Sequence, residues 1–198
     1  MRWLLLLLLV LVCTAVAVSR FVPKIETVNV SGNAHYDYQE VLELANVALG
    51  EPLLWVTKWS LQDLANDPWV LSAAVSRIWP DRVDIVMSER FPVLSDGVTA
   101  WSDDGTVLPG ASEVYPDLPQ LSGWGTPRVT EALELLRLLS AYEPQVISYS
   151  PEGFEIQLIG TTLLTPSVDA LREQWSAFVT HRGERVAVYP WGVSSADE

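Results

Sequence analysis

The sequence predicts an α+β protein with an apolar N-terminal helix, a β-α-α-β-β unit and a mixed β-sheet domain with two helices. Three observations predict it. Residues 3–18 form a run without charge or proline. Pro68–Pro92 contains two strand-like runs around a turn, and Val83, Ile85 and Met87 alternate with other residues in its second half, as in a β-hairpin. Further strand-like runs and two helical stripes follow this hairpin.

Composition excludes several classes of protein. Apolar residues make up 49% of the 198 residues, so the chain can bury a core and global disorder is excluded. The net charge of -13 argues against nucleic-acid binding and against electrostatic docking on anionic lipid. The one cysteine, Cys13, lies in the apolar run, so one chain cannot form a disulfide framework or a cysteine-based metal site.

Two interpretations of the N-terminus stay open on physical grounds. With Phe21 and Val22 the run reaches about 20 residues, near the length that spans a bilayer. It can be a cleaved signal with Ala15–Ala17 as the cleavage site. It can also be an uncleaved anchor at residues 3–22, with residues 1–2 as a cytoplasmic stub. Both interpretations export the rest of the chain.

A first folded unit is predicted over residues 23–91. Ile25–Val30 alternates as a short strand, and Asp37 with Glu40 forms a capping-box-like start to a helix. Ser60 opens a second helix, which stops before the hairpin. We therefore expect two helices over a three-stranded sheet.

Four motifs follow one another in this unit and connect it to a known family. The motifs are Val28–Asn33, Asp67–Val70, Trp79–Asp81 and Glu89–Pro92. Their order and spacing closely resemble those of the POTRA domain of the FtsQ/DivIB bacterial cell-division proteins. The resemblance implies that the N-terminal segment is a retained anchor and that residues 92–198 form an FtsQ-type β domain.

The pattern beyond residue 92 supports a second, mixed domain. A strand pair flanks the turn Asp103–Gly105, and Thr126-Pro127 begins an amphipathic helix after an irregular connection over residues 109–127. Three strands, a last helix opened by Thr165-Pro166 and a final strand Val186–Tyr189 follow, before a frayed acidic tail. Leu164-Thr165 and Val186–Tyr189 depart from the glycine and the Asp-Leu-Arg-like triplet that the family commonly shows.

The residues predict no catalytic, cofactor-binding or metal site. His35 and His181 are the only histidines and lack the spacing of a metal pair, and no nucleophile elbow or phosphate-binding loop is present. The adjacent carboxylates Asp103 and Asp104 belong to a turn. We therefore expect a protein that is not an enzyme, without cofactors or a small-molecule substrate.

The resemblance implies a non-enzymatic divisome scaffold. The chain would pass once through the bacterial inner membrane at the division septum, with the N-terminus cytoplasmic and the bulk extracytoplasmic. Outside the membrane it would bind FtsB/DivIC-like and FtsL-like membrane proteins and contact other divisome proteins. It would thereby help control septal peptidoglycan synthesis by the FtsW and penicillin-binding-protein pair.

The sequence also suggests where partners bind. We expect a partner segment to add to the unpaired edge of the last strand, Val186, Ala187, Val188 and Tyr189. Trp191 would be an aromatic anchor there, or would instead pack under the last helix. Two further sets are a hairpin partner face of Val83, Ile85 and Met87, and a domain junction of Glu89, Arg90 and Pro92.

Two other classes remain as alternatives. One is a POTRA-containing exported adaptor of another envelope assembly system; a version that ends in an outer-membrane barrel would need many more amphipathic strands. The other is a secreted hydrolase whose site the motifs do not reveal.

Overall fold

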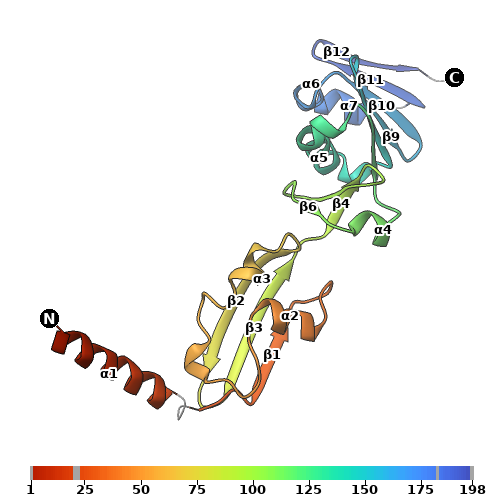
Figure 1. The fold of residues 1–198 in the computed structure, drawn as a ribbon. Helices are drawn as coiled ribbons and strands as arrows, with labels where there is room; N and C mark the ends of the chain where they lie inside the picture. Colours follow the sequence, from red (N-terminus) through yellow and green to blue (C-terminus); the bar gives the residue numbers. More distant parts are fainter. Residues whose placement is uncertain (1, 20–22, 182, 197–198) are drawn as a thin grey trace. The chain divides into compact units, whose positions relative to one another are not determined.

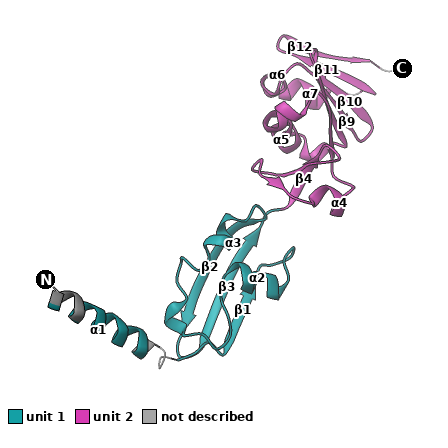
Figure 2. Cartoon of the chain, in the orientation of Figure 1, with its two compact units in different colours: residues 1–90 teal, residues 91–198 magenta. Residues whose placement is uncertain are grey.

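The protein contains two compact units, residues 1–90 and residues 91–198 (Figure 1, Figure 2). The computed structural model describes residues 2–19, 23–181 and 183–196. Each unit has its own cluster of buried apolar side chains and its own β-sheet, of three strands in the first unit and nine in the second. The protein therefore has the mixed α+β architecture that the sequence predicts.

The first unit begins with α1, Arg2–Ser19. Large apolar side chains of this helix, including Leu7 and Leu11, are exposed. In the ranges that the structure describes, no helix combines the length and the apolarity needed to cross a membrane. The predicted anchor covers residues 3–22, of which residues 20–22 lie outside the described residues, as does Met1 of the predicted cytoplasmic stub. The anchor stays a prediction.

The rest of the first unit has the predicted β-α-α-β-β order. Its sheet has the strand order β1-β3-β2, with β1 parallel and β2 antiparallel to the central strand β3. A capping box starts the first helix here: the Asp37 side chain accepts from the Glu40 N–H, and the Glu40 side chain accepts from the Asp37 N–H. The elements are β1 (Thr27–Ser31), α2 (Tyr38–Leu44), η1 (Leu53–Trp55), α3 (Gln62–Asn66), β2 (Val70–Ile78) and β3 (Arg82–Glu89).

The last residue of β3 ties this strand to the loop before α2. The buried Glu89 carboxylate accepts hydrogen bonds from the backbone N–H groups of Ala34, His35 and Tyr36, at 2.7, 2.6 and 3.2 Å. In the same region the Tyr36 hydroxyl donates to Asp67 at 2.8 Å. These bonds satisfy donors that helix and strand ladders leave open, so Glu89 has a structural role.

The second unit is built on a single nine-stranded sheet. Its order is β12-β11-β10-β9-β8-β7-β4-β5-β6, with parallel pairs at β10/β11, β7/β8 and β4/β7. The strands are β4 (Pro92–Ser95), β5 (Ala100–Ser102), β6 (Val107–Leu108), β7 (Gln120–Gly123), β8 (Val146–Ser150), β9 (Gly153–Leu158), β10 (Thr161–Thr165), β11 (Arg185–Tyr189) and β12 (Gly192–Ala196).

The longer helices of this unit pack against one face of the sheet (Figure 1). Side chains from α5 and α7, such as Leu135 and Phe178, meet inward-facing strand residues, such as Ile156 and Val188, in one core. Within the described residues, the helices of this core lie on one face of β9–β11, and side chains such as Glu155 and Tyr189 are exposed on the opposite, helix-free face. The helical elements are α4 (Ala111–Val114), η2 (Thr126–Arg128), α5 (Val129–Leu138), η3 (Ser140–Tyr142), α6 (Val168–Glu173) and α7 (Trp175–Thr180).

Three differences from the expected second domain concern short elements. The connection over residues 109–127 contains α4 and β7 and is not wholly irregular. Pro92, expected at the domain junction, is the first residue of strand β4. The last helix is interrupted at Gln174, which separates α6 from α7, and it begins after the N-cap Ser167. Short segments of this kind are defined by their pairing partners, which local patterns do not contain.

Candidate partner-binding edge

The chain ends in a hairpin that forms one edge of the nine-stranded sheet. β11 pairs in parallel with β10 on one side and antiparallel with β12 on the other. The prediction that Val186–Tyr189 is an unpaired edge is therefore wrong, because both sides of this strand are used. The expected frayed tail was also wrong for Gly192–Ala196, which is strand β12; residues 197–198 lie outside the described residues.

β12 is one of the two edge strands of this sheet, and β6 is the other. In the described part of the chain β12 pairs with β11 alone and ends the sheet. Its five residues, Gly192–Ala196, include no charge and no proline, the residues that commonly protect edges from further pairing. The backbone N–H and C=O groups on its outer side can therefore accept an added strand.

Two aromatic rings stand at the turn of this hairpin. Tyr189 and Trp191 stack with ring centroids 5.2 Å apart and planes within 5° of parallel. Trp191 is 82% exposed, which excludes the alternative that it packs under the last helix. The side-chain amide of Gln174 donates to the Pro190 carbonyl at 2.9 Å and holds the turn against the start of α7. The turn thus presents a rigid, exposed aromatic pair.

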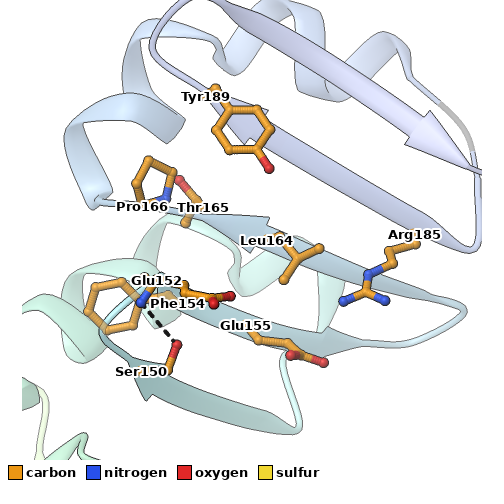
Figure 3. Close-up of a pocket in the computed structure, with 10 residues that line it drawn as sticks. Ser150, Glu152, Phe154, Glu155, Leu164, Thr165, Pro166, Arg185 and Tyr189 are labelled. Atoms are coloured by element: carbon orange, nitrogen blue, oxygen red, sulfur yellow. Dashed lines mark hydrogen bonds between the residues drawn. The ribbon is translucent and has the colours of Figure 1, made fainter.

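A hollow lies beside these rings on the helix-free face of the sheet. It has a volume of about 280 Å³. Figure 3 shows Tyr189 over the hollow, and the Arg185 guanidinium and the Glu155 carboxylate pointing into it near Leu164. Leu164 on β10 is paired with Glu155 on β9 and with Ala187 on β11. The side chains of Glu155, Leu164 and Ala187 therefore form one row across these three strands. The row continues through Ser194 on β12.

Each residue predicted for the last strand has a distinct place. Val186 and Val188 are buried in the core of the second unit and cannot contact a partner through their side chains. Ala187 and Tyr189 lie on the opposite, helix-free face. Of the predicted set, Ala187, Tyr189 and Trp191 are thus placed where a partner could reach them, while partner binding itself stays a prediction.

The predicted partner face of the first hairpin is wrong. Val83, Ile85 and Met87 are all buried and belong to the core beneath α2 and α3. The same alternation that made them conspicuous puts Val86 and Ser88 on the exposed face. The apolar side of this strand faces α2 and α3. The alternating pattern therefore identifies core residues and not a partner-binding face.

The predicted junction residues belong to different units. The Arg90 guanidinium donates to the carbonyls of Pro68 and Val70, at 3.1 and 2.5 Å, and thus secures the start of β2. Glu89 is held by the loop before α2, as described above, and Pro92 is the buried first residue of β4. Phe91, between them, is exposed. The junction is thus a single residue between two anchored segments.

The histidines have local partners. His35 stacks on Trp69 with ring centroids 3.6 Å apart, and the His181 ring lies 2.7 Å from the Ala177 carbonyl at the end of α7. Over the described residues, no three His, Cys, Asp or Glu side chains gather in a way that could hold a metal ion.

The sequence contained a signal for the missed edge. Pro190-Trp191 occupies a two-residue connection between Tyr189 and Gly192, and proline at the second position with glycine at the fourth favours a tight turn. The small residues Ser194, Ser195 and Ala196 have low strand preference, which hid the strand after the turn.

Comparison with known proteins identifies the first unit as a POTRA domain. Residues 24–90 match the family described as "POTRA domain, FtsQ-type". These residues contain the three-stranded sheet, its two helices and the Glu89 contacts.

Two curated relatives extend the likeness beyond this domain. The chain is 30% identical over 131 residues to a "Cell division protein FtsQ" of Bradyrhizobium diazoefficiens, across 63% of this chain and 37% of the relative. It is 33% identical over 88 residues to a "Cell division protein FtsQ" of Corynebacterium glutamicum, across 43% of this chain and 40% of the relative. The alignments thus span about two fifths of each relative. Residues 24–90 are thus similar to FtsQ-type POTRA domains, and the chain is similar to part of two cell division proteins named FtsQ.

Proposed function

We propose that this protein is a non-enzymatic scaffold of the bacterial division machinery. It binds FtsB/DivIC-like and FtsL-like membrane proteins outside the inner membrane and helps control septal peptidoglycan synthesis. The match of residues 24–90 to FtsQ-type POTRA domains and the similarity to two proteins named FtsQ support this proposal. The observation that carries it in the structure is the open outer side of β12 beside an exposed aromatic pair.

The mode of binding follows from the chemistry of this edge. A partner segment adds as a tenth strand on β12, and its backbone pairs with the outer groups of Gly192–Ala196. Trp191 and Tyr189 bury against its apolar side chains, which supplies affinity. Arg185 and Glu155 line the neighbouring hollow. They favour partner segments with charged residues of complementary sign next to the part that pairs with β12.

We also propose that residues 3–22 hold the protein at the inner membrane. The uncharged run at residues 3–18 and the exposed leucines of α1 support this. With the N-terminus in the cytoplasm, both folded units are exported. This location would place the β12 edge in the same compartment as the extracytoplasmic parts of its partners.

The experiment that tests the proposal compares co-purification from bacterial membranes. A variant that lacks residues 192–198 should lose the FtsB-like and FtsL-like chains and its septal localisation, while its first unit stays folded. A matched control, Trp124→Ala, removes an exposed tryptophan of the same unit away from β12 and should retain both properties. Full retention of the partners by the truncated variant would overturn the proposed edge.

A further inference from the structure

Three segments of the first unit meet where the chain arrives from α1, and we call this region the proximal end. The Leu53 N–H donates to the Pro23 carbonyl at 3.0 Å, and the Ile25 N–H donates to the Glu51 carbonyl at 2.9 Å. On the other side, the Glu26 N–H donates to the Asp81 carbonyl at 2.8 Å. The loop around η1 and the β2–β3 turn therefore both flank the first residues after α1. The proximal end comprises residues 23–26, 51–60 and 77–82.

Exposed tryptophans gather at the proximal end. Trp59 is 81% exposed, Trp79 is 62% exposed, and Leu54 and Trp55 are partly exposed beside the buried Leu53. The Ser60 hydroxyl lies 3.5 Å from the Trp55 carbonyl, which folds the turn carrying Trp59 back towards η1. Large apolar side chains grouped on a surface in this way indicate a contact with something apolar.

Charge at the proximal end differs from that of the whole chain. Residues 23–89 contain four basic side chains, and all four lie here although the net charge of the protein is -13. Acidic residues are present as well, and Arg82 lies 3.4 Å from Asp84. Tryptophan beside lysine or arginine is the composition that favours the boundary between lipid headgroups and acyl chains. The four basic residues are Lys24, Lys58, Arg77 and Arg82.

Chain length keeps the proximal end close to α1. Four residue steps separate Ser19 from Pro23, so the end of α1 lies within about 14 Å of Pro23, the first residue of the proximal end. This bound holds for any orientation of the helix. If α1 enters a bilayer, the exposed tryptophans are within reach of its surface.

We propose that the proximal end rests on the membrane, with Trp55, Trp59 and Trp79 in the headgroup region. This inference rests on the proposed function, because it needs α1 to be held by lipid. The lipid surface covers apolar side chains that the fold leaves exposed, and the basic residues beside them meet anionic headgroups. The first unit then contacts the bilayer through its turns, which leaves its strands accessible to other proteins.

Tryptophan quenching by brominated lipid tests this contact on the full chain. The protein is reconstituted into phosphatidylethanolamine–phosphatidylglycerol vesicles with or without lipid brominated close to the headgroup. Trp3→Phe removes the tryptophan of α1 and serves as the background. In this background we expect clear quenching by brominated lipid. Adding Trp55→Phe, Trp59→Phe and Trp79→Phe should remove most of it.

Matched controls separate lipid contact from general exposure. Trp124→Phe and Trp191→Phe, in the same background, change two exposed tryptophans of the second unit and should leave the quenching unchanged. The single variant Trp59→Phe repeats the measurement at a side chain that the fold barely uses, so a folding defect cannot decide the result. It should give a partial loss.

The outcomes distinguish the inference from the proposed function. If the protein floats with the vesicles but the Trp3→Phe background is not quenched, the inference is wrong and the anchor stands. If quenching persists after Trp55, Trp59 and Trp79 are all replaced in this background, the inference is also wrong. If the wild-type protein does not float with vesicles, the proposed anchor and this inference both fail. Partner co-purification through β12 is read separately and depends on neither result.

Discussion

Strand β3 of the first unit and strand β12 of the second unit occupy opposite positions in their sheets. β3 is central, pairs on both sides, and presents Val83, Ile85 and Met87 to its own helices. β12 ends its sheet, and its last three residues are small and exposed, near the exposed Trp191. In β3 the strong alternation of apolar and polar residues therefore identifies side chains that form the core of the first unit. The weak pattern marks the strand on which a partner can add.

The largest effect is expected in the core of β3. Ile85→Ala removes a fully buried side chain and leaves a cavity, so the free energy of unfolding of the first unit should fall by about 2–5 kcal/mol. Hydrogen exchange of the β2 and β3 amides measures this unit separately from the second. Val86→Ala, one residue along on the exposed face, should change stability by no more than about 0.5 kcal/mol. Equal costs at the two positions would contradict the assignment of faces.

The end of β3 should be the next most sensitive position. Glu89→Gln weakens the charge-assisted bonds to the N–H groups of residues 34–36 and should cost about 2 kcal/mol. The same hydrogen-exchange measurement reports this loss. Ser88→Ala, on the exposed side of the strand, is the control. A neutral result at Glu89 would show that the negative charge adds nothing to these bonds and would contradict the expected loss.

At the β12 edge the expected effect is on binding rather than on stability. Trp191→Ala should weaken the partner about tenfold, which corresponds to about 1–2 kcal/mol, because an exposed anchor is removed. Isothermal titration with a partner segment measures the affinity, and thermal unfolding should be unchanged. Trp124→Ala should alter neither quantity. A loss of stability without a loss of affinity would reverse the contrast between the two strands.

The smallest effect concerns Tyr36 beside Glu89. Burial first, and then the bond to Asp67, raise the pKa of Tyr36 above the ordinary tyrosine value. The folded protein therefore holds this proton more tightly than the unfolded chain. The stabilisation is complete below about pH 10 and is lost as the pH rises above it. Tyr36→Phe should cost about 1 kcal/mol near neutral pH. A difference from wild type that does not shrink in alkaline solution would exclude this linkage.

Local sequence patterns predicted the elements that are long, periodic or capped. The capping box at Asp37 and Glu40, the β2–β3 hairpin and the Thr126-Pro127 start before α5 are confirmed. β4, β7 and β12 were missed because each is short and depends on a partner strand distant in sequence, or on a turn between weak strand formers. The site was only partly predictable for the same reason. Trp191 and Tyr189 were selected by residue type, but which side of β11 is open depends on the pairing of the last five described residues.

The central claim, that the β12 edge recruits the partner, can be tested directly by site-specific photo-crosslinking in intact cells. A photoreactive residue at Ser194 of β12 is compared with one at Val107 of β6, the strand at the opposite end of the same sheet. The account predicts that Ser194 captures an FtsB-like chain and that Val107 does not. Capture at Val107 with none at Ser194 would contradict it.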